Sequence, residues 1–267
     1  WEDQQGIVPQ EEDPLSSQPS EGFIEAVKPK TLTISALGTY QRCPRQYMYG
    51  TVYGFRGEEA TYRLFWNAVQ NTLEALKSQL EANQEDFPTQ EEAQLLYTHY
   101  WQEWGGHTFP FATLYERHGH EVTELVRRRL LERGDTSWQL RQNFTVDIAG
   151  RTIEVAVDRV EAPAQAGEPM RLVRARFGKR KEKPTASTRE LLYARASRQY
   201  HPGRNFELLV HNMSTGETLQ VKLTEKREQS LYDELEQAIL DLERNEFPPK
   251  PDPFLCPNCS FFLICPA

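Results

Sequence analysis

The sequence predicts an α/β domain with a helical insertion before its sheet. Apolar residues at helical spacing dominate the first half of the chain, and segments that alternate apolar with polar residues follow, separated by a further helix. With 267 residues, 38% of them hydrophobic, the chain is long enough to form one large domain with a sizeable core.

The elements are expected in the order helices, strands, helix, strands, helix. A short helix is predicted over 35–50, with Ser35 as its N-cap. The other helices are predicted over 64–82, 90–104, 114–133, 187–200 and 226–245, and the strands over 141–148, 151–160, 170–176, 206–212 and 218–223. The helical insertion spans 60–135, and Gly150 marks the turn between the first two strands.

Residues 1–29 are predicted to be an acidic disordered linker, and residues 30–267 the folded domain. Seven acidic residues and no Lys or Arg lie within 1–25, so this segment carries most of the net charge of −8. No run of eighteen apolar residues occurs and no signal peptide begins the chain, so we expect no membrane partner and a cytoplasmic location. Because the chain lacks a starting Met, we expect it to be a piece of a longer protein.

Three of the four cysteines lie in the last dozen residues: Cys256, Cys259 and Cys265, with Cys43 far away in the sequence. Two disulfides and four unrelated buried cysteines are alternatives, but a C-x-x-C turn lets two thiolates reach one metal centre. Zinc and a [4Fe–4S] cluster both accept four thiolates. The one-plus-three spacing and the neighbouring apolar residues favour the [4Fe–4S] cluster, with zinc as the alternative, and either centre would join the start of the folded domain to its end.

The segments "TISALGTYQRCPRQYMYG" and "FPPKPDPFLCPNCSFFLICP" resemble the iron-staple nuclease domain of the RecB/AddB type, a branch of the PD-(D/E)xK superfamily, and the resemblance covers about residues 30–267. It implies a nuclease-like central mixed sheet flanked by helices, with the cysteine cluster at 256–265 closing on Cys43. It also implies a parent protein that is an ATP-dependent DNA helicase of repair or recombination. No phosphate-binding G-x-x-x-x-G-K-[ST] motif occurs here, so this chain is not the motor.

Active members of this family cut phosphodiesters with magnesium or manganese, which carboxylates hold, and with a lysine near the phosphate. Asp158 is kept in "VAVDRVE", and Tyr193 is kept in "RELLY". The other matching positions are changed: Gln70 replaces a histidine, Arg174 an aspartate, Arg176 the lysine and Arg189 a glutamine. We therefore expect no intact catalytic set and no catalytic magnesium or manganese, with Arg174 and Arg176 beside Asp158 on the neighbouring strand.

A basic strip begins within the third predicted strand and continues after it, in "MRLVRARFGKRKEK". Its members are Arg171, Arg174, Arg176, Lys179, Arg180, Lys181 and Lys183. A positive strip in a cleft shaped for a DNA strand would bind phosphates, and a solvated charged loop is the alternative. Two functions remain open. The first is an inactive nuclease-like module that binds DNA, single-stranded by preference, or that scaffolds helicase domains of the same or a partner chain. The second is an active metal-dependent DNA exonuclease or endonuclease with an altered site.

Overall fold

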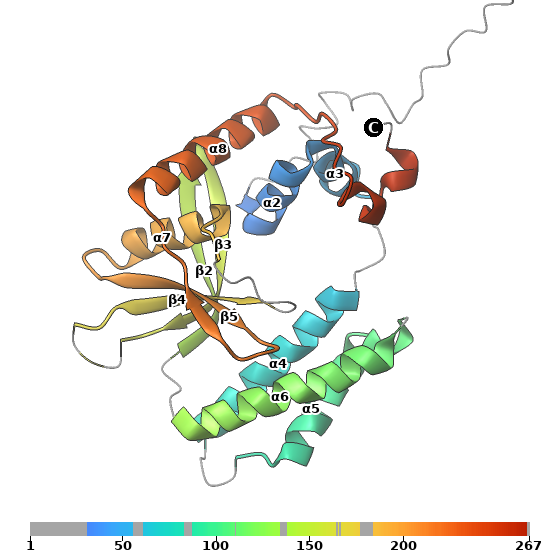
Figure 1. Cartoon of the computed structure of the whole chain (residues 1–267), viewed down its shortest axis with the longest axis vertical. Helices are drawn as coiled ribbons and strands as arrows, with labels where there is room; N and C mark the ends of the chain where they lie inside the picture. The colour runs from blue at the N-terminus through green and yellow to red at the C-terminus, as the bar shows by residue number, and fades with distance from the viewer. Residues whose placement is uncertain are drawn as a thin grey trace, which may run out of the picture.

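The computed structural model describes residues 31–55, 61–82, 87–109, 111–133, 138–163, 165, 167–176 and 184–265. They form a mixed α/β domain in which helices flank a central mixed sheet, as predicted (Figure 1). The helices are α2 (Ile34–Arg42), α3 (Pro44–Tyr47), α4 (Thr61–Ala82), α5 (Gln90–Glu103), α6 (Ala112–Arg133), α7 (Thr188–Tyr200) and α8 (Glu225–Glu243). The strands are β1 (Leu32–Thr33), β2 (Trp138–Ile148), β3 (Arg151–Glu161), β4 (Met170–Arg176), β5 (Phe206–Asn212) and β6 (Thr218–Gln220). The predicted linker, 1–29, lies outside the described residues.

The sheet is organised around β3, which pairs with three strands. β2 runs antiparallel to it along one edge, and β1 and β4 share the other edge, β1 parallel and β4 antiparallel. β4 then pairs in parallel with β5, and β5 antiparallel with β6. The hairpin from β2 to β3 turns at Ala149 and Gly150, whose φ angles of 50° and 75° suit a two-residue turn. This confirms the turn predicted at Gly150.

The main hydrophobic core lies between the sheet and helices α2, α7 and α8. Val155 of β3, Leu192 of α7 and Ile239 of α8 are all fully buried there. Helix α7 begins with a capping box, in which Ser187 and Glu190 exchange hydrogen bonds, and α8 begins at the N-cap Thr224. These caps fix the first turns of the two helices that cover the sheet.

The insertion is a bundle of α4, α5 and α6 with a hydrophobic core of its own. Tyr97 and Trp101 of α5 are fully buried in that core. In Figure 1 the bundle lies at the bottom of the view, and α2, α7 and α8 lie above it. All three helices fall within the predicted insertion, 60–135. A hydrogen bond of 3.2 Å between His118 of α6 and Ser214 ties the bundle to the loop after β5.

The predicted first helix needs two corrections. Its N-cap is Thr33, whose Oγ1 accepts from the N–H of Ala36 at 3.1 Å, and not Ser35, which lies inside the helix. The helix is also interrupted at Cys43, whose extended backbone separates α2 from α3, and a π-helical turn (Met48–Val52) follows. Among the helices that the structure describes, none is long and apolar enough to span a membrane.

Candidate functional site

A pocket of about 110 Å³ lies between the helical insertion and the sheet. Gln70 of α4 and Asp158 of β3 both line it, so the structure brings these two predicted site positions together. Gln70 is 2% exposed, and among the described residues its buried Oε1 has no hydrogen-bond partner.

A second wall of this pocket joins α6 to the hairpin of β5 and β6. Arg129 Nη1 lies 3.0 Å from Nε2 of the buried His211, and Arg129 also donates to the carbonyl oxygen of Gly216. Since a guanidinium can only donate, Nε2 of His211 must accept, which places the ring proton on Nδ1. That proton is donated to Thr218 Oγ1 at 2.8 Å, so the imidazole is neutral in this arrangement.

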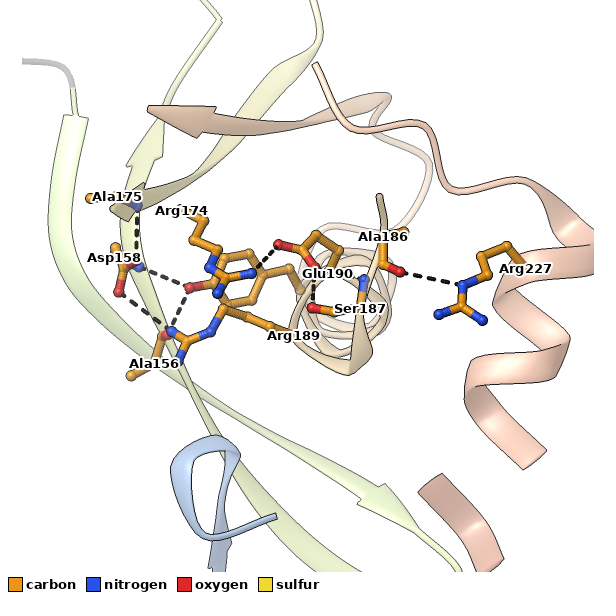
Figure 2. Close-up of polar contacts among 10 residues, drawn as sticks. Ala156, Asp158, Arg174, Ala175, Ala186, Ser187, Arg189, Glu190 and Arg227 are labelled. Carbon is orange, nitrogen blue, oxygen red and sulfur yellow. Dashed lines mark hydrogen bonds and ion pairs between the residues drawn. The ribbon is translucent and has the colours of Figure 1, made fainter. Parts of the chain in front are cut away.

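The carboxylate of Asp158 accepts a backbone hydrogen bond just beyond the point where β3 and β4 stop pairing. The ladder between β3 and β4 is formed at Arg159 and Val173, Val160 and Leu172, and Glu161 and Arg171. Beyond it, Asp158 Oδ2 accepts from the backbone N–H of Ala175 at 2.9 Å (Figure 2). One carboxylate oxygen thus connects the two strands where they cease to pair.

The other oxygen of Asp158 faces α7. Arg189 Nη1 lies 3.8 Å from Oδ1 of Asp158, and the Tyr193 hydroxyl donates to the carbonyl oxygen of Ala156 at 3.2 Å. Burial raises the pKa of Tyr193 to about 12, and the charge of Asp158 adds to this effect. Burial opposes the charge on Arg189, but Tyr193 and Asp158 outweigh it and raise the pKa of the guanidinium. A permanent cation therefore stands beside the carboxylate.

Glu190, the next residue along α7, supplies a second buried carboxylate. Its side chain is 3% exposed. Oε2 accepts from the backbone N–H of Ser187 at 2.8 Å and from the Ser187 hydroxyl, while Oε1 accepts from Arg174 Nη1 at 3.1 Å. Figure 2 shows Arg174 reaching from β4 to this carboxylate. Both acids near the site are thus held by arginines and by backbone donors.

The four cysteines line a second pocket, of about 240 Å³. Cys43 enters it from the junction of α2 and α3, and the other three enter from the C-terminal 3-10 turns, η3 (Cys256–Asn258) and η4 (Phe262–Ile264). The red C-terminal segment lies beside α3 in Figure 1, and the Tyr49 hydroxyl donates to the carbonyl oxygen of Ile264 at 3.2 Å. All four thiols are free, so no disulfide has formed.

The residues around the cysteines suit a group bound through thiolates. The backbone N–H of Asp252 points at Cys256 Sγ, 3.2 Å away, and the rings of Tyr49 and Phe261 pack 5.5 Å apart beside the pocket. Arg45 also lines the pocket and has a buried Nε without a hydrogen-bond partner. Within the described ranges, no three His, Cys, Asp or Glu side chains are grouped closely enough to hold one metal ion.

Comparison with known families decides the relationship of the chain. A sequence model of the PD-(D/E)XK nuclease superfamily matches residues 31–266. The chain belongs to the PD-(D/E)XK nuclease superfamily. Among solved structures it is similar to a "Putative exonuclease" from Eubacterium rectale, at 14% identity and a TM-score of 0.56, over 91% of this chain and 92% of that one. A second, SSO0001, has 12% identity and a TM-score of 0.40 over 94% and 89% of the two chains. A comparison of the sequence with curated proteins found no match.

Within this superfamily fold, the arginines of β4 do not lie as the sequence predicts. Arg174 and Arg176 are expected beside Asp158, but Arg174 pairs with Glu190, and the structure gives Arg176 no ion pair among the described residues. The guanidinium at Asp158 belongs to Arg189 instead. The physical reason is that the ladder between β3 and β4 ends at Arg159 and Val173. Beyond it the side chains meet partners on α7: Asp158 meets Arg189, and Arg174 meets Glu190.

The predicted DNA-binding strip is only partly described. Arg171 lies 3.7 Å from Glu207 and 3.8 Å from Glu161, which also pairs with Arg159 at 2.8 Å, so carboxylates offset part of its charge. Arg176 ends β4 half-buried. Lys179, Arg180, Lys181 and Lys183 lie outside the described residues.

Glu190, Arg129, His211 and Arg45 are site residues that the sequence reasoning missed. The Ser187-x-x-Glu190 spacing, typical of a capping box, was an available signal for Glu190. Arg129, His211 and Arg45 have no comparable local signal, because their roles depend on contacts between distant elements.

Proposed function

We propose that this domain is a nuclease-fold module that no longer cuts DNA and that binds DNA, or scaffolds the helicase domains of a repair or recombination enzyme of the RecB/AddB type. The observation that carries the proposal is the state of Asp158. Its Oδ2 accepts a hydrogen bond from the backbone N–H of Ala175, and its Oδ1 forms an ion pair with Arg189. A divalent cation needs several free oxygen ligands, and a guanidinium in the same place repels it.

The four cysteines support a [4Fe–4S] cluster as the module's cofactor. They line one pocket, and their one-plus-three spacing differs from the paired C-x-x-C spacing that is usual at structural zinc sites. A cluster spreads its four thiolates over more space. Cys43, Cys256, Cys259 and Cys265 would hold the cluster, which when bound would cross-link α2 to the end of the domain.

Arg176 is the described residue that best supports contact with DNA. Unlike Arg171 and Arg174, it has no carboxylate partner among the described residues, so its charge is available to a phosphate. Substituting Arg176→Gln should weaken single-stranded DNA binding and lower the salt dependence by about one counterion. Arg171→Gln is the matched control, since its charge is already partly offset by Glu161 and Glu207, and it should change binding less.

The alternative is an active metal-dependent nuclease with an altered site. It is favoured by a second buried carboxylate, Glu190, which follows Arg189 directly on α7, and by the name of the similar solved structure. Cleavage of single- and double-stranded DNA with magnesium or manganese separates the two functions. We expect no cleavage by the unmodified domain. Activity that disappears in Asp158→Ala would establish the alternative, whereas activity that persists in Asp158→Ala would come from a contaminant.

A further inference from the structure

Arg45 is a buried cation with no anion beside it in the described structure. The residue lies in α3, two positions after Cys43, and is 6% exposed. Its Nε is buried without a hydrogen-bond partner, and its Nη1 lies 3.8 Å from Met48 Sδ, which is a weak acceptor. Burial of a charge without a counter-charge is costly. Arg127 and Arg198, by contrast, each pair with a carboxylate.

The pocket that Arg45 lines is positive and also contains the four cysteines. Among the described residues, three cations border it, namely Arg42, Arg45 and Lys250, and no Asp or Glu lines it. Arg42 is exposed to solvent, and Lys250 donates to the carbonyl oxygen of Gln41 at 3.3 Å. Four thiolates around a [4Fe–4S]²⁺ core carry a net charge of −2, so the pocket matches such a centre in charge as well as in ligands.

We propose that Arg45 is the counter-cation of the thiolate-bound centre and that it raises the reduction potential of the cluster. This inference rests on the proposed [4Fe–4S] cofactor. Reduction adds one electron and therefore one negative charge to the centre. A buried guanidinium stabilises the more negative state more strongly through its charge. Arg45 is a positioning and tuning residue and not a ligand.

The test is a redox titration of anaerobically purified protein, in which dithionite supplies the electron and the reduced cluster is followed by electron paramagnetic resonance. Arg45→Met should move the midpoint to a more negative potential. We expect at least a tenfold lower ratio of reduced to oxidised cluster at the wild-type midpoint, which corresponds to about 59 mV for one electron. Arg45→Lys, which keeps the charge, should lie between the two proteins.

Arg42→Met is the matched control, because it removes the same group from the same pocket at an exposed position. It should change the potential less than Arg45→Met, since water screens its charge. If Arg45→Met keeps the wild-type potential and a full iron content, the inference is overturned although the cluster stands. If the wild-type protein contains no iron, the cofactor proposal fails first, and the inference fails with it. Should Arg45→Met not fold, the shift in Arg45→Lys decides.

Discussion

Substitution Glu190→Gln should destabilise the domain by about 2–3 kcal/mol, although the two side chains have the same shape. The side chain is 3% exposed and accepts two hydrogen bonds from Ser187 and one from Arg174. Gln keeps one acceptor oxygen, and its NH₂ must face either the Ser187 donors or the guanidinium. Both Ser187 donors bond to the same oxygen, so the amide oxygen can keep the capping box, and the NH₂ then faces the Arg174 guanidinium. A buried polar group without a partner costs about 1–3 kcal/mol.

The ion pair itself adds little to this figure. Arg174 is 36% exposed, so water screens its charge, and we assign the pair at most about 1 kcal/mol. The cost should therefore come mainly from the buried amide group that faces the guanidinium. A double-mutant cycle with Arg174→Met separates the contributions and should give a coupling free energy of about 0.5–1 kcal/mol.

The assay is urea unfolding of both proteins under anaerobic conditions, with stabilities compared from the midpoints at equal m-values. Glu207→Gln is the control, because its carboxylate is 34% exposed and pairs with Arg171 only at 3.7 Å. This variant should lose less than about 0.5 kcal/mol. If Glu190→Gln also loses less than that, the buried site does not require a carboxylate at residue 190, and the reasoning is refuted.

Two further predictions concern the staple and pH. Cys43→Ser should lose the bound iron and become sensitive to limited proteolysis. A cluster that cross-links Cys43 to the C-terminal cysteines would close a long loop, and by analogy with a disulfide this stabilises the fold by about 4–5 kcal/mol. Unchanged protease resistance would contradict this prediction. Arg198 of α7 holds the pKa of Glu228 of α8 below its usual range. The ion pair between them therefore contributes stability above the unfolded pKa of about 4.3, and this contribution is lost as the pH falls through the lower, native pKa. Wild type should therefore exceed Glu228→Gln by up to about 1 kcal/mol at pH 7 and match it in strong acid, as measured by unfolding at both pH values.

The order and type of the elements followed from local patterns in the sequence. Strand alternation and the turn at Gly150 defined β2 and β3, and apolar spacing defined α4, α5 and α6. Strand β1 was not predicted, because its two residues become a strand only by pairing with Ile153 and Glu154 far along the chain. That pairing also explains the misplaced N-cap, since helix α2 begins directly after Thr33.

For the candidate site, the sequence predicted the positions and the structure supplied the partners. The motif around Asp158 was recognisable because its residue types are local to one strand. Which arginine meets Asp158 was not, since this depends on where β3 and β4 separate and on how α7 packs into the gap. Arg189 and Glu190 are neighbours in the sequence, yet they pair with different strands.

The cysteine pocket and the pocket that contains Asp158 are connected through Gln41, the penultimate residue of α2. Its side-chain oxygen accepts from the hydroxyl of Thr188, the first residue of α7, at 2.9 Å, and its carbonyl oxygen accepts from Lys250 at 3.3 Å. Cys43 follows two residues later, and Arg189 follows Thr188 directly. The cysteine pocket and the arginine beside Asp158 are therefore held by the same helix end. At this point two arginines, Arg174 and Arg189, join β4 and β3 to α7.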